Sequence, residues 1–160
     1  LVQAIDYRKG PYFAEVGAEN MGAGMFGFHT FPDNPDWQGW WGDEPPFRWP
    51  VYVLTHPAPR PPIEMAGGTT FNFLSATPQE ALDLALEAAD GKDVRLGGGV
   101  RTVREFLEAD LVDTMHVAVA PVEIGRGGRL WESPDELLDR FHLEVVPSPS
   151  GVVHHLFWRR

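Results

Sequence analysis

The stretch that decides the fold is residues 94–107, VRLGGGVRTVREFL. Residues 93–96 predict a short strand, and three glycines follow it directly. The apolar residues after the glycines recur at helical spacing: Val100, Val103, Phe106 and Leu107. A strand, a glycine turn and a helix in direct succession are typical of an open α/β sheet, where ligands bind at the carboxyl ends of the strands.

The glycine turn is itself a candidate site. Gly97, Gly98 and Gly99 lack a Cβ, so the backbone there can come into contact with a ligand. The free N–H groups at the start of the following helix favour an anion such as a phosphate. The turn matches neither the GxGxxG fingerprint nor a GxxxxGK[ST] loop. The glycines alone leave two interpretations open: a phosphate site, or a tight turn that packs the helix on the sheet.

A second unit of the same kind precedes it. Residues 18–21 predict a strand, residues 22–24 a small-residue turn, and Met25, Phe26 and Phe28 the start of a helix. Two buried strands are predicted at 51–55 and 69–74. Thr77 and Glu80 form a capping box ahead of a helix whose apolar face stops at Gly91.

The two ends of the chain differ in character. Residues 1–16 predict two short helical pieces, whereas strands are predicted at 114–124, 141–146 and 152–158, the last two as an antiparallel pair. We therefore expect one domain over residues 1–160, with a mostly parallel sheet and antiparallel strands at one edge. The loop 29–50 carries Phe31, Trp37, Trp40 and Trp41, which form either the lid of a flat heterocycle site or a cover of the core.

Composition narrows the function. The chain has 160 residues and a net charge of −10, which would repel nucleic acid. It contains no cysteine, which excludes thiolate sites and fits a cytoplasmic protein. No apolar run is long enough to span a membrane. The histidines lack ligand spacing, so we expect no metal site, and no serine lies in a hydrolase motif.

These features together resemble a known family. The glycine triplet between strand and helix, the turn at Met21 and Gly22, the strand end VLT and the terminal antiparallel pair resemble the dihydrofolate reductase fold. The sequence LVDTMHVAVAPVEIGRGGRLW, residues 111–131, is similar to the reductase domain of the bacterial deaminase–reductase of riboflavin biosynthesis. The resemblance runs from Gly17 to the C-terminus. It implies a three-layer α/β fold with helices on both faces of a mixed, mostly parallel sheet.

The resemblance also implies a function: reduction of a small heterocyclic or carbonyl substrate by NADPH. The pyrophosphate would lie on Gly97, Gly98, Gly99, Val100, Arg101, Thr102 and Val103. A second turn, formed by Gly22, Ala23, Gly24 and Met25, would face its other side. Thr55 and His56 match positions that contact the adenosine 2′-phosphate in the family.

The chain departs from the family in two ways. Relatives carry MGR where this chain has Met21, Gly22 and Ala23, so a phosphate-binding arginine is absent and NADH stays open beside NADPH. His56, Arg60 and Arg101 are the cations that would compensate. Relatives also begin with a central strand and a loop over the nicotinamide, so we expect further residues upstream and assign no catalytic residue.

Two further expectations concern activity and assembly. The competing function is a non-catalytic ligand-binding module of the same fold, in which Ala23 marks a lost cofactor site. A homodimer is expected because relatives pair through sheet edges. The apolar strand 152–158 would otherwise present an exposed edge to other chains.

Overall fold

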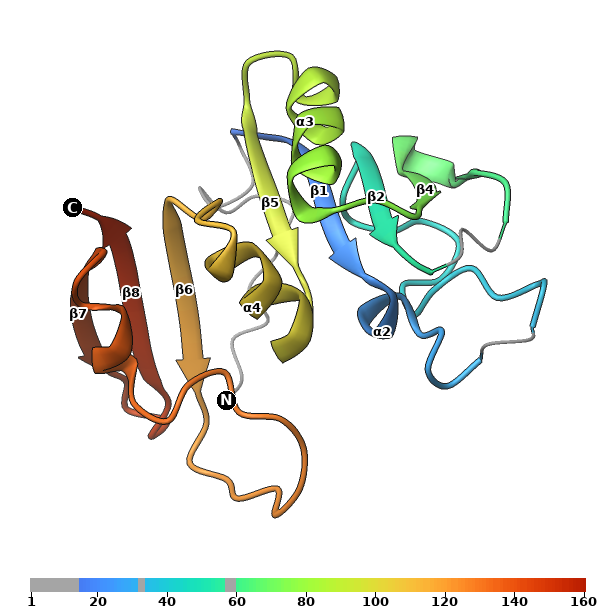
Figure 1. Cartoon of the computed structure of the whole chain (residues 1–160). Coiled ribbons are helices and arrows are strands. Elements are labelled where there is room, and N and C mark those ends of the chain that lie inside the picture. Colours follow the sequence, from blue (N-terminus) through green and yellow to red (C-terminus); the bar gives the residue numbers. More distant parts are fainter. Residues whose placement is uncertain (1–14, 32–33, 57–59) are drawn as a thin grey trace. The chain divides into compact units, whose positions relative to one another are not determined.

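The computed structural model describes residues 15–31, 34–56 and 60–160. They fall into two compact units, one ending at Glu105 and the other beginning at Phe106, and each unit has its own sheet (Figure 1). The helical pieces predicted within residues 1–16 lie almost wholly outside the described residues. A single domain over residues 1–160 stays a prediction.

The sheet of the first unit has the strand order β3-β4-β2-β1-β5. Its strands are β1 (Val16–Gly22), β2 (Pro50–Leu54), β3 (Ile63–Glu64), β4 (Thr70–Leu74) and β5 (Asp93–Gly97). All neighbours are parallel except β3, which runs antiparallel to β4. The predicted parallel strands are thus confirmed. The two-residue strand β3 and the 3-10 turn η1 (Ala66–Gly68) were not predicted, because they are too short to show a period.

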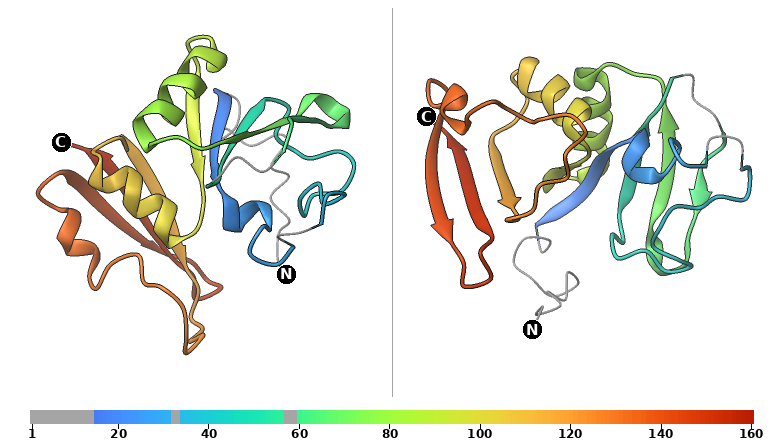
Figure 2. Two further views of the ribbon diagram at one scale, coloured as in Figure 1. Left: turned by 45° about the vertical axis from the view of Figure 1, so that its right-hand side comes forward. Right: turned by 90° about the horizontal axis from the view of Figure 1, so that it is seen from below.

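Helix α3 (Pro78–Ala89) covers one face of this sheet (Figure 2). The predicted capping box is present: the Glu80 N–H donates to Thr77 Oγ1 over 3.3 Å, and the Thr77 N–H donates to Glu80 Oε2 over 2.8 Å. Ala85 and Ala89 pack against Ala18 of β1. These small side chains let the helix lie close to the strand, so the apolar layer between α3 and the sheet is thin.

The opposite face holds an aromatic core. Its fully or nearly fully buried members are Met21, Phe26, Phe47, Val51, Val53, Phe71 and Phe73. Phe26 comes from α2 (Ala23–Phe26), a single turn that ends at Gly27 with φ 108°. Trp41 stacks on Phe71 with ring centroids 5.7 Å apart, so this part of the loop covers the core, as one of the two interpretations held. Trp40 is 54% exposed and packs on Trp37.

The second unit contains a three-stranded antiparallel sheet of order β6-β8-β7. Its strands are β6 (Thr114–Val119), β7 (Phe141–Pro147) and β8 (Val153–Arg159). The predicted antiparallel pairing of β7 with β8 is confirmed. The strand predicted over 114–124 was too long, since β6 ends at Val119. Pro121 has no N–H for a sheet, and Val122 and Ile124 beyond it are 72% and 80% exposed.

The prediction that residues 152–158 form an exposed edge was wrong. β8 is the central strand and pairs with β6 on one side and β7 on the other. The sequence predicted the pairing with β7 but not the pairing with β6, because β6 lies far earlier in the chain and no local pattern links it to β8. His154 and His155 are successive residues of β8 and point to opposite faces of the sheet. His154 Nδ1 lies 2.9 Å from His116 Nε2, whereas the His155 ring packs near Trp131.

The class of fold is as expected: α/β, with a mostly parallel sheet and an antiparallel C-terminal sheet. Within the first unit, α2 and α3 contribute to opposite faces of the sheet, since Phe26 packs with Met21 and Ala85 with Ala18. Side chains on successive β1 residues alternate between these faces.

Candidate functional site

Because β1, β2, β4 and β5 are parallel, their carboxyl ends lie at one edge of the sheet (Figure 1). Every predicted cofactor residue lies at this edge or in the segment that follows a strand there. β5 and its glycine turn are next to β1, with Met21 opposite Gly97. The two predicted turns are therefore neighbours in space, although about 75 residues separate them in sequence.

The three glycines after β5 have different surroundings. None of the three has a positive φ. The close approach of neighbouring atoms, rather than the backbone angle, therefore explains why these residues are glycines. A Cβ on Gly97 would overlap Glu19 Oε1, and a Cβ on Gly98 would lie 3.0 Å from Thr102 Cβ. A Cβ on Gly99 would meet nothing within 4 Å. Packing thus fixes the first two glycines, while the third borders open space.

Helix α4 (Val100–Glu108) starts directly after this turn. Its first closed turn is marked by the Val103 N–H, which donates to the Gly99 carbonyl over 3.2 Å. The N–H groups of Val100, Arg101 and Thr102 precede that bond and have no partner within the helix. They carry the positive end of the helix dipole, so an anion beside Gly99 would be stabilised there.

Thr102 connects the two turns. A Cβ on Gly22 would overlap the Thr102 hydroxyl, the same side chain that limits Gly98. Gly22 ends β1, and Ala23 begins α2. The next glycine, Gly24, lies under the His29 ring, since a Cβ there would be 2.9 Å from the imidazole. No local pattern pointed to His29, because its contact with Gly24 depends on how the chain turns after α2.

A polar pair lies at the ends of β2 and β4. The Thr55 N–H donates to the Leu74 carbonyl over 2.7 Å, and His56 Nδ1 lies 2.9 Å from Ser75 Oγ. Both side chains of this pair are in reach of solvent. Ser75 was not among the predicted site residues. The available signal was its place directly after β4, beside the end of β2 that Thr55 and His56 follow.

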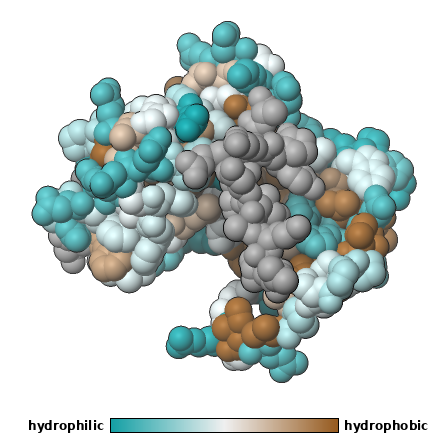
Figure 3. All heavy atoms as spheres, turned by 180° about the vertical axis from the view of Figure 1, so that it is seen from behind, coloured by the Kyte–Doolittle hydropathy of each residue, from teal (hydrophilic) through white to brown (hydrophobic). Residues whose placement is uncertain are grey.

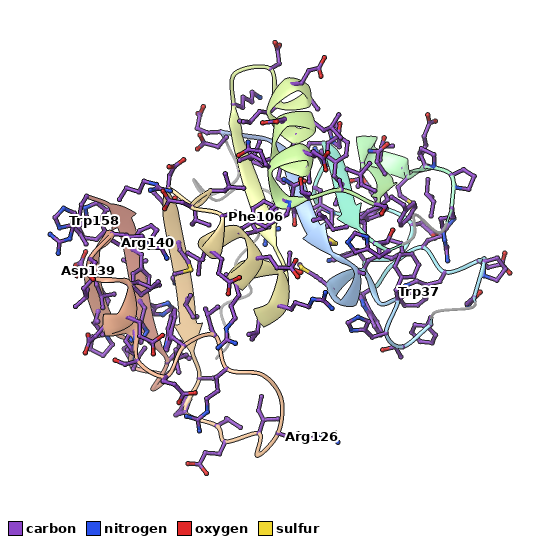
Figure 4. The ribbon with its side chains drawn as sticks, in the orientation of Figure 1. Trp37, Phe106, Arg126, Asp139, Arg140 and Trp158 are labelled. Carbon is purple, nitrogen blue, oxygen red and sulfur yellow. The ribbon has the colours of Figure 1, made fainter. Side chains whose placement is uncertain are left out.

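Of the three cations that were expected to compensate for Ala23, Arg60 and Arg101 are engaged elsewhere. The Arg60 guanidinium donates to the carbonyls of Asn34, Pro35 and Trp37, and it lies over the Phe28 and Phe73 rings at 5.1 and 5.7 Å. It therefore holds the loop that carries Trp37, whose indole N–H donates to the Phe26 carbonyl (Figure 4). Arg101 is exposed and pairs with Glu105 at 2.9 Å.

Glu19 is a charged group that the sequence analysis did not single out. Its side chain is fully buried in β1, and Arg95 Nη1 lies 2.7 Å from its Oε1. Burial raises the pKa of this carboxyl, and the neighbouring Arg95 acts in the opposite direction. The Trp49 side chain also hydrogen-bonds this carboxyl and, like Arg95, opposes the rise in its pKa.

The second unit offers less chemistry. The described residues contain no group of three or more His, Cys, Asp or Glu side chains that could hold a metal ion. Burial, and after it the neighbouring His154, lowers the pKa of the His116 imidazole.

No helix among the described residues is long and apolar enough to cross a membrane.

Comparison with known proteins agrees with this geometry. Residues 18–148 match the family described as the RibD C-terminal domain. The chain belongs to that family. The match covers both glycine turns and most of the C-terminal sheet, so the resemblance expected from the sequence is confirmed.

Solved structures show the RibD C-terminal domain fold as well. A putative riboflavin biosynthesis protein from Shewanella sp. PV-4 superposes with a TM-score of 0.58 at 20% identity, over 100% of this chain and 83% of that one. The deaminase/5-amino-6-(5-phosphoribosylamino)uracil reductase of Thermotoga maritima gives 0.56 at 12% identity, over 91% of this chain and 46% of that one. RibD of Acinetobacter baumannii gives 0.51 at 16% identity, over 93% and 48%. This chain thus spans about half of the latter two proteins. Curated protein sequences gave no match.

Proposed function

We propose that this RibD C-terminal domain is a reductase that transfers hydride from NADPH or NADH to a small heterocyclic or carbonyl substrate. One observation carries the proposal: two glycine turns meet on the Thr102 side chain at the carboxyl edge of the sheet, where α4 begins. The family and the reductase activity named for the Thermotoga maritima protein support the reaction type. A cytoplasmic location stays part of this proposal.

The residues present fit a dinucleotide. The N–H groups of Val100, Arg101 and Thr102 would donate to pyrophosphate oxygens, and Gly99 leaves open space for them. β2 lies two strands from β5, about 10 Å at the usual strand spacing, so His56 stands about one nucleoside away from the phosphate turn. Ser75 follows β4, one strand further, and reaches His56 Nδ1 over 2.9 Å. They would bind the adenosine end.

When bound, the nicotinamide supplies the hydride, and the protein binds and orients it. The His56 and Ser75 pair has an imidazole N–H and a hydroxyl to offer a ribose or a 2′-phosphate. At the turn after β1, Ala23 carries no charge that would favour a 2′-phosphate, so the proposal includes both NADPH and NADH. We assign no described residue to the proton-transfer step.

A fluorescence titration tests the proposal. The chain has six tryptophans, and we expect their emission to be quenched as NADPH binds. Gly98→Ala presses on Thr102 and should raise the Kd for NADPH about tenfold. A wild-type protein with no quench and no calorimetric binding heat would contradict the proposal.

A turnover assay separates the enzyme from the binding module. NADPH oxidation is followed with dihydrofolate, ribitylated or ribosylated aminopyrimidines and simple carbonyl compounds. Oxidation that depends on one of these compounds supports a reductase and names its substrate class. Tight NADPH binding without oxidation in any assay favours the non-catalytic module.

A further inference from the structure

Glu19 is unusual in its surroundings. Its side chain has an exposed fraction of 0% in the middle of β1, between β2 and β5. Arg95 Nη1 donates to Oε1 over 2.7 Å, and the Trp49 side chain is a second polar neighbour of the carboxyl. A buried ion pair commonly stabilises a fold less than apolar side chains of the same volume. Stability is therefore a poor explanation for a carboxylate here.

The position of the carboxylate points to a different role. Glu19 is opposite Arg95 in the pairing of β1 with β5, and Gly97 is two residues further along β5 on the same face. A Cβ on Gly97 would overlap Glu19 Oε1, so the carboxylate fills the space that a side chain at position 97 would need. The first glycine of the phosphate turn is thus dictated by Glu19.

The same contact includes the second turn. The hypothetical Cβ on Gly97 would also lie 3.1 Å from Met25 Sδ, and Met25 belongs to α2. Gly97 therefore lies between the carboxylate and a side chain from the turn after β1. The bridge to Arg95 fixes the orientation of the carboxylate, since an ion pair with a hydrogen bond holds one rotamer.

We propose that Glu19 is a positioning residue for the phosphate turn: Arg95 holds its carboxylate, and the carboxylate supports Gly97 against Met25. This inference rests on the proposed function, because the turn is its phosphate site. Arg95 also balances the negative charge that the carboxylate would otherwise place beneath a bound pyrophosphate. An amide of the same shape would keep the support, whereas a methyl group would remove it.

A double-mutant cycle tests the contact, with NADPH as the ligand and with the melting temperature and Kd measured for each variant. Gly97→Ala should raise the Kd about tenfold, and adding Glu19→Ala to it should recover at least about threefold. The matched control adds Glu87→Ala, an exposed carboxylate on α3, to Gly97→Ala. That pair should show no recovery.

Single variants of Glu19 keep the test decisive if Gly97→Ala fails to fold. Glu19→Ala should raise the Kd about fivefold, and Glu19→Gln should stay within about twofold of the wild type. A lower melting temperature with an unchanged Kd in Glu19→Ala, or strict additivity in the cycle, would overturn the inference. The affinity of the wild type for NADPH is measured first. If the wild type does not bind NADPH, the proposed function is rejected. If it binds but Glu19→Ala leaves the Kd unchanged, or the cycle is additive, only the role of Glu19 is rejected.

Discussion

At the scale of single residues, the contacts that shape the site join positions far apart in sequence. Glu19 meets Arg95 and Gly97, and Gly22 meets Thr102. The sequence predicted the glycine turns because a local pattern marks them. It did not predict Glu19, since its partners are known only once β1 and β5 are paired. The one local sign of its role was a charged residue within a segment predicted to be a buried strand.

The buried carboxyl makes stability depend on pH. Burial raises the pKa of Glu19 in the folded state, so the unfolded chain loses this proton first as pH rises. The free energy of unfolding therefore falls between the ordinary pKa of a glutamate, about 4.3, and the raised folded value. We expect Glu19→Gln to gain stability relative to the wild type across this window, measured by urea unfolding at several pH values. A difference that is the same at every pH would contradict the assignment.

Ala23 bears on the choice of cofactor. An arginine there would add a charged hydrogen bond to a 2′-phosphate, worth about 1.5–3 kcal/mol. Ala23→Arg should therefore raise the preference for NADPH over NADH about tenfold or more. The two Kd values are compared by titration, with Ala23→Gln as the uncharged control. An unchanged ratio would mean that the 2′-phosphate lies away from the turn after β1.

At the scale of elements, local signals and tertiary pairing explain different parts of the fold. The capping box, the glycine turns and the β-branched strands are local, and α3, α4, β1 and β5 follow the predictions closely. The end of β6 and the central place of β8 depend on partners and were missed. The conformation of the loop 34–49 also depends on tertiary contacts, because the loop is held by Arg60 and by the aromatic core.

The capping box of α3 is the local device with the clearest energetic effect. Thr77→Ala removes both the acceptor for the Glu80 N–H and a hydroxyl contact with Glu80, and should lower the free energy of unfolding by about 1 kcal/mol. Thr77→Ser keeps the oxygen and serves as the control. Urea unfolding measures both variants, and NADPH affinity should stay unchanged. Equal stability of the alanine and serine variants would show that the cap contributes little.

At the scale of the molecule, the chain is acidic overall, and among the described residues the large exposed apolar side chains lie mainly in the second unit. Hydrophobic side chains gather on the loop after β6, at the bottom of Figure 3, where Val122 and Ile124 are strongly exposed and Arg126 projects (Figure 4). On β7, Val145 and Val146 are 50% and 39% exposed. Among the described residues β6 and β7 each pair only with β8, and we assign the role first expected of β8 to the outer edge of β7, which carries these two valines.

We therefore keep the homodimer as a prediction but place its contact on β7. A lysine on an edge strand opposes pairing with another chain, since its charge would lose water beside the side chains of the added strand. Val145→Lys should convert a dimer at high micromolar concentration to a monomer, as measured by light scattering. Val122→Lys carries the same change of charge in the loop after β6 and should remain dimeric. A monomeric wild type would refute the dimer, whereas a dimer that survives Val145→Lys would move the contact to another surface.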